Sequence, residues 1–112
     1  MSNDKVIYNR NLRWVGLVIL HAQRTKGRAE SGGWVREEVF RKMLDDQGYG
    51  LTLHELRDLM VYLSDPEIRC VETEKKGDAE PRLYRYRITA RGVRAVEREE
   101  EIPGVGIYGH DE

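Results

Sequence analysis

The side chains of this chain that are best suited to bind a ligand are the lysines and arginines of its second half. Residues 69–98 carry a net charge of +4, whereas residues 1–68 are neutral and residues 99–112 carry −5. Lysine and arginine neutralise phosphates, which makes binding to nucleic acid depend on salt. The overall charge of −1 therefore conceals a basic segment followed by an acidic tail. Ordinary variation in surface charge is the alternative interpretation.

Five basic residues concentrate around one polar stretch of that segment, and they are Lys75, Lys76, Arg82, Arg85 and Arg87. They alternate in part with Tyr84 and Tyr86, a pattern typical of a strand with two different faces. Arg85 and Arg87 have a second interpretation, because they can pair with Glu72 and Glu74 across a hairpin. Three further arginines could extend the basic surface or remain a solvated face: Arg91, Arg94 and Arg98.

Residues that could support catalysis or bind a metal are poorly arranged. The three histidines lie far apart in the sequence and show no ligand-type spacing with the single cysteine, Cys70. Cys70 falls within a strand and is expected in the core. Asp45 and Asp46 are adjacent, so they point to different sides of a helix. The glycines near Gly32 and Gly48 match no phosphate-binding loop. We therefore expect a binding protein rather than an enzyme, with no cofactor and no metal.

Apolar spacing and turn residues predict three helices before the basic segment. The first runs from about Arg10 to Thr25 and follows a loose arm or a short edge strand at residues 1–8. The second runs from about Val35 to Asp46, with Val39 among its inward residues, and Gly48 after it suits a left-handed cap. The first helix has a wide apolar arc, which suggests a central core helix or a helix that also meets a second subunit.

The third helix has the clearest start signal. Thr52 and Glu55 have the spacing of a capping box, and Pro66 ends the helix near Ser64. Its outward residues include one cation, Arg57, and one opposing anion, Asp58. The others are Thr52 and His54, and Tyr62 is a further candidate for this side. This helix is therefore nearly neutral on the side that would meet a partner.

After Pro66 the period of the sequence changes to that of strands. Residues 68–74 and 81–89 read as two strands joined by a polar hairpin loop at 75–80, and Thr89 caps a last helix over about 90–100. The order predicts an α+β fold of the winged helix-turn-helix kind, with three helices, a two-stranded hairpin or wing, and a C-terminal helix. Residues 1–100 form one domain, and residues 101–112 form an acidic, extended tail containing Gly and Pro.

The stretch from Arg82 to Gly92 resembles the second wing strand and the following helix start of many winged-helix proteins. In those families an aromatic, basic and apolar stretch leads to Thr, two variable residues and Gly, and here Ile88, Thr89 and Gly92 match it. From residue 10 to about residue 106 the chain is similar to small winged-helix proteins of Mu-like phages and prophages. The resemblance implies a DNA-binding protein, of the kind that regulates transcription.

In winged-helix proteins that bind DNA, the third helix enters the major groove and the wing contacts the backbone or minor groove. We therefore predict that double-stranded DNA is bound by Thr52, His54, Arg57, Lys75, Lys76, Arg82, Arg85 and Arg87. The alternative is a winged helix used for protein contact or dimerisation without DNA, which the neutral third helix and acidic tail favour. The acidic tail could also fold over the basic wing and tune its binding.

A homodimer would pair the first and last helices, through Trp14, Leu17, Val18, Val93 and Val96. No apolar stretch is long enough to span a bilayer, and the N-terminus lacks the order of a secretory signal. A single cysteine excludes an internal disulfide. The sequence therefore predicts a cytoplasmic protein.

Overall fold

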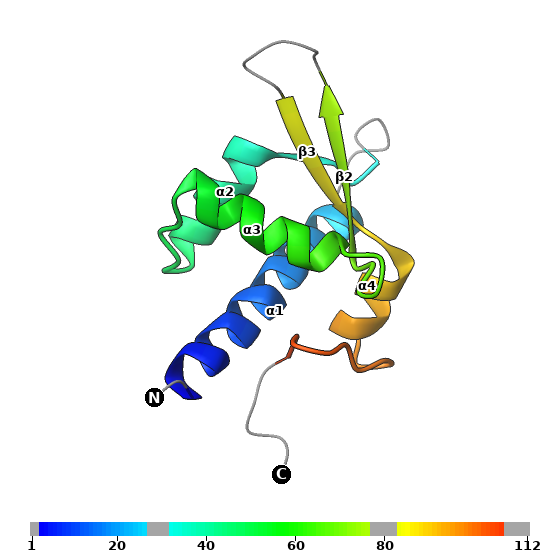
Figure 1. Ribbon diagram of the computed structural model, residues 1–112. Helices are drawn as coiled ribbons and strands as arrows, with labels where there is room; N and C mark the ends of the chain where they lie inside the picture. The colour runs from blue at the N-terminus through cyan, green and yellow to red at the C-terminus, as the bar shows by residue number, and fades with distance from the viewer. Residues whose placement is uncertain (1–2, 27–31, 77–82, 107–112) are drawn as a thin grey trace.

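The structure, a computed structural model, describes residues 3–26, 32–76 and 83–106 (Figure 1). Within these residues, four helices pack against a three-stranded antiparallel sheet of order β1-β3-β2. The elements in chain order are α1 (Asn3–Lys26), β1 (Val35–Arg36), α2 (Glu37–Asp46), α3 (Leu53–Ser64), β2 (Val71–Lys76), β3 (Leu83–Ile88) and α4 (Ala90–Val96). The predicted α+β class is confirmed.

Helix α1 starts earlier than predicted. Residues 3–8 form its first turns, whereas the sequence predicted a loose arm or a short edge strand there. Three consecutive apolar residues, Val6 to Tyr8, suggested an edge strand, yet they continue the helix, and Asp4 lies in its first turn, where the helix dipole favours an acidic residue. These turns project from the rest of the molecule (Figure 1). Farther along, Leu12, Leu17 and Leu20 are buried in the core. Among the described residues, no helix is long and apolar enough to cross a membrane.

The prediction that the second helix begins at Val35 is wrong. Val35 and Arg36 form a short strand, β1, in which Val35 lies opposite Tyr86 of β3. Helix α2 begins after it at Glu37, and Phe40 and Leu44 are its most buried apolar residues. Val39, expected to face inward, is 41% exposed. The two-residue strand pairs the backbone with β3, which a sequence pattern based on side chains does not reveal.

The predicted start of α3 is confirmed. The Glu55 backbone N–H donates to Thr52 Oγ1 at 3.1 Å, and the Thr52 N–H donates to Glu55 Oε1 at 2.8 Å. The connection from α2 includes Gly48 at φ +95°, where an L side chain would be strained. The buried face of α3 consists of Leu56, Leu59, Met60 and Leu63.

Strands β2 and β3 form a hairpin that extends beyond the helices (Figure 1). Strand β2 begins at Val71 and reaches Lys76, so Lys75 and Lys76 belong to a strand and not, as predicted, to the loop. On its inner face Val71 lies opposite Ile88, and both are buried against the helices. The hairpin tip at 77–82 lies outside the described residues.

The C-terminal part departs from the predicted extended tail. Helix α4 ends at Val96, before the predicted end near residue 100. Beyond it, Ile102 and Val105 are buried. The Tyr62 hydroxyl donates to the Pro103 carbonyl at 2.8 Å, and Arg13 Nη1 donates to the Gly104 carbonyl at 2.9 Å. Ile102 and Val105 are therefore part of the core, which continues past residue 100, whereas their neighbours Glu101 and Pro103 are exposed.

Candidate nucleic-acid interface

The predicted DNA-binding residues separate onto two faces of the hairpin. Side chains alternate along a strand, so Lys75 and Tyr84, which lie opposite each other, share the face that carries the buried residue Tyr86. The Arg57 guanidinium of α3 lies 4.3 Å from the centre of the Tyr84 ring on this side. We call this surface, formed by Arg57, Lys75 and Tyr84 together with Thr73, the α3–hairpin face.

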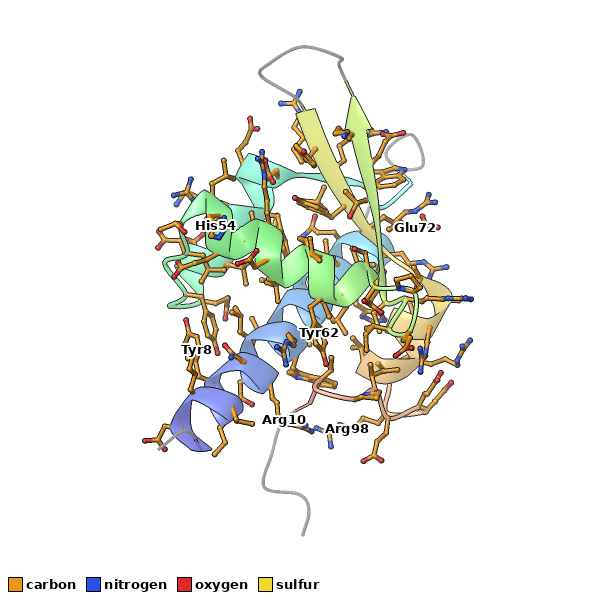
Figure 2. All side chains as sticks on the ribbon, in the orientation of Figure 1. Tyr8, Arg10, His54, Tyr62, Glu72 and Arg98 are labelled. Atoms are coloured by element: carbon orange, nitrogen blue, oxygen red, sulfur yellow. The ribbon has the colours of Figure 1, made fainter. Side chains whose placement is uncertain are left out.

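The opposite surface, which we call the outer hairpin face, consists of Glu72, Glu74, Arg85 and Arg87. Figure 2 shows Glu72 on the far side of the hairpin from His54 of α3. Because the two faces point in different directions, one straight duplex lying against α3 does not contact both. The eight predicted residues therefore do not form one surface.

The arginines of the outer hairpin face are held by partners. Arg87 Nε and Nη2 donate to Glu72 Oε1 at 2.9 and 2.6 Å, and Arg85 pairs in the same way with Glu74 Oε1. The guanidinium carbon of Arg85 lies 5.0 Å and that of Arg87 lies 4.5 Å from the centre of the Trp34 ring. The cross-strand pairing that the sequence left open is thus confirmed. A phosphate would have to compete with a carboxylate for each arginine, so these residues are poor candidates for DNA contacts.

Arg57 belongs to a partly buried network. Its Nε and Nη2 donate to the two carboxylate oxygens of Glu37, both at 2.9 Å, and the Tyr86 hydroxyl donates to Glu37 Oε2 at 2.6 Å. Burial acts to raise the pKa of Glu37, but the hydrogen bonds from Arg57 and Tyr86 outweigh it and hold this pKa below its usual value. The network joins α2, α3 and β3. The Arg57 side chain nevertheless remains 41% exposed on the α3–hairpin face.

Glu37 was not among the predicted site residues. It lies in the first turn of α2, where an acidic side chain is common for reasons of the helix dipole alone. Only the approach of α3 and β3 reveals that it is 8% exposed and accepts three hydrogen bonds. The polar partners Arg57 and Tyr86 are distant in the sequence, so local spacing carried no signal for this network.

The remaining predicted DNA-binding residues differ in how exposed their side chains are and in the contacts that these make within the fold. The Thr52 side chain caps α3. His54 is highly exposed, and its Nε2 lies 3.4 Å from Asp58. Lys75 is exposed in β2. The backbone of Lys76 belongs to β2, but its side chain and the whole of Arg82 lie outside the described residues.

Other candidate groups belong to the core or to the surface. Cys70 is fully buried, and burial raises the pKa of its thiol to about 11. The His21 side chain is 23% exposed and lies 3.5 Å from Glu97. In residues 3–26, 32–76 and 83–106, no three histidine, cysteine or acidic side chains gather as a metal site would require. Of the residues expected at a dimer contact, Leu17 is fully buried, and Trp14, Val93 and Val96 are packed against the core.

The chain matches no protein-family model, no curated protein and no solved structure. A functional conclusion therefore depends on the order of the elements, the side chains of the two hairpin faces and their charges.

Proposed function

We propose that this protein is a winged-helix protein that binds double-stranded DNA, as a phage-type transcriptional regulator would. The observation that carries the proposal is the order of the elements: α2, a short turn and α3 are followed by a projecting hairpin. Lys75 of this hairpin lies on the same side as Arg57 of α3. In winged-helix proteins this arrangement sets the recognition helix in the major groove and the hairpin along the backbone.

The contact set is smaller than the sequence predicted. Within the described residues it consists of His54 and Arg57 on α3 and of Lys75 on β2. Lys76 holds a strand position in register with the outer hairpin face, and Arg82 lies outside the described residues. Thr52, Arg85 and Arg87 are engaged within the fold and are left out. Few cations then meet phosphates, and the exposed Asp58 beside His54 opposes them. We expect weak binding with little sequence preference and a shallow dependence on salt.

Titration of a labelled duplex by fluorescence anisotropy at several salt concentrations tests this proposal. Lys75→Glu should weaken binding about tenfold and lower the salt slope by about 1, because one phosphate contact is lost. The matched control is the double variant Glu74→Ala/Arg85→Ala, which changes the outer face of the same hairpin without changing net charge. It should bind like the wild type. The proposal would be contradicted if the wild-type protein showed no salt-sensitive binding to any duplex at low salt.

Protein contact without DNA is the second candidate function. It is favoured by the outward side of α3, where Val61 is 68% exposed and His54 lies beside Asp58. Such a surface is nearly neutral and partly apolar, which suits a protein partner better than a phosphate backbone. The absence of DNA binding in the titration, with the protein folded, would favour this candidate.

A further inference from the structure

A groove runs between α1 and α3, on the flank of α3 that faces away from the hairpin. Its volume is about 340 Å³, and its lining includes the buried side chains of Leu12, Leu51 and Leu59. Tyr8 and Tyr62 line it as well, from α1 and α3 respectively. Figure 2 shows these two tyrosines on the side of α3 that lies toward α1. The groove thus combines an apolar floor with aromatic walls, as many protein contact surfaces do.

The first turns of α1 form one end of this groove, and Tyr8 packs there against the turn that follows α2, with its ring centre 5.5 Å from that of Tyr49. Residues 4–8 are all exposed, and among them Val6 is 53% and Tyr8 46% exposed. A helix end that packs through so few side chains is marginally stable in water. Apolar side chains on such an end gain stability when a partner covers them.

The two walls of the groove carry opposite charges. The α1 wall contributes Lys5 and Arg13, and the α3 wall contributes Glu55 and Asp58. Arg13 donates to the Gly104 carbonyl and its guanidinium carbon lies 3.8 Å from the centre of the Tyr62 ring, whereas Glu55 accepts from the Thr52 N–H. Asp58 lies 3.4 Å from His54 Nε2. No ion pair joins the two walls within the described residues. The groove therefore presents a basic edge and an acidic edge side by side.

This charge pattern is complementary to a second copy of itself. A two-fold axis that runs along the groove places the α1 wall of one copy against the α3 wall of the other, twice. An axis across the groove would place like charges together. Two-fold dimers are the commonest protein assemblies, and their interface is the same patch on both subunits. In such a dimer the basic edge and the acidic edge of each copy both meet opposite charges, without an unrelated partner.

We propose that the α1–α3 groove is the interface of a symmetric homodimer, in which the basic α1 wall of each copy lies against the acidic α3 wall of the other. This interface differs from the pairing of first and last helices that the sequence suggested. It lies on the opposite flank of α3 from Arg57. Asp58 borders His54 of the DNA contact set, so the variant that tests dimerisation without changing that set is the one on the α1 wall, Lys5→Glu.

Exposed charges on the two walls allow a complementation experiment with the full-length chain. Lys5→Glu reverses a charge on the α1 wall, and Asp58→Lys reverses one on the α3 wall. Both side chains are exposed, so folding, checked by circular dichroism, should be preserved. Sedimentation equilibrium is run at about 20 mM salt. The Debye length is then about 20 Å, so all the charges of one wall act on the opposing wall. Lys42→Glu on α2 makes the same charge change outside the groove and serves as the control.

The expected result is a wild-type dimer that dissociates as salt is raised. Each single groove variant should dimerise about tenfold more weakly, because two like-charge contacts are created per dimer. An equimolar mixture of the two variants should recover the dimer, since opposite walls again carry opposite charges. The Lys42→Glu control should behave as the wild type. A wild type that is monomeric up to about 100 μM, or a mixture that is no more dimeric than its components, would overturn the proposal.

Discussion

At the scale of single residues, Glu37 joins three elements of the structure, although the sequence did not single it out. Its carboxylate is nearly buried at the junction of α2, α3 and β3 and accepts from both Arg57 and Tyr86. A buried charge is costly unless it is paired and hydrogen-bonded, and here both conditions are met. The same contacts fix Arg57 beside Tyr84 and so define the α3–hairpin face.

Replacing this carboxylate tests the network. Glu37→Gln should lower the free energy of unfolding by about 1–3 kcal/mol at pH 7, because Arg57 loses its charged partner. Glu38→Gln is the matched control, since its side chain is 74% exposed and pairs only loosely with Arg36. Urea denaturation of both variants and the wild type measures the difference. A loss no larger than that of the control would contradict the role assigned to Glu37.

The pH dependence of the same measurement has a definite sign. The pKa of Glu37 in the folded state lies below its ordinary value of 4.5, so the ionised carboxylate stabilises the fold above that pH. This contribution is lost as the pH falls through the folded-state pKa. The difference in free energy of unfolding between the wild type and Glu37→Gln should therefore decrease below about pH 4.5. The corresponding difference for Glu38→Gln should stay small at every pH.

At the scale of elements, the two helical glycines illustrate how packing decides what propensity cannot. A Cβ on Gly92 of α4 would lie 2.5 Å from the Cys70 carbonyl oxygen and 2.6 Å from Ile88 Cγ1. A Cβ on Gly16 of α1 would lie 3.5 Å from the nearest atom of Phe40, an ordinary contact. Gly92 thus lets the backbone of α4 approach the hairpin closely, while Gly16 has room for a methyl group.

Alanine should have opposite effects at these two positions. Gly92→Ala should destabilise the protein by about 2 kcal/mol, because neighbouring backbone must move. Gly16→Ala should be neutral or stabilise it by up to about 1 kcal/mol, since alanine favours helix. Thermal or urea unfolding of the two variants compares them directly. A Gly92→Ala variant as stable as the wild type would contradict the claim that the close approach of α4 to the hairpin requires glycine there.

The sequence predicted the elements whose signals are local. The capping box of α3, the Thr89 cap of α4 and the tyrosine alternation of β3 all appear in the structure. It did not predict the β1 strand, whose pairing depends on β3, or the first turns of α1, whose consecutive apolar residues resemble a strand. Nor could it choose between free and paired states of Arg85 and Arg87, because that choice depends on the register of the hairpin.

At the scale of the whole molecule, the segment of residues 101–106, which follows the last helix, packs back against α1 and α3. Ile102 and Val105 are buried, and the Pro103 and Gly104 carbonyls accept from α3 and α1. Removing residues 101–112 to test an acidic tail would therefore also remove part of the core. A regulatory role of the tail has to be tested by neutralising its acidic residues while this segment is kept.

Shortening a single side chain measures what this closing segment contributes. Ile102→Ala should lower the free energy of unfolding by about 2 kcal/mol, because it removes buried apolar volume between the C-terminal segment and the helices. Val61→Ala, at a side chain that is 68% exposed on α3, should change it by less than about 0.5 kcal/mol. Urea denaturation monitored by circular dichroism compares the two variants. Equal small effects would mean that residues 101–106 lie on the surface of the fold without stabilising it, and the single-domain core would then end with α4.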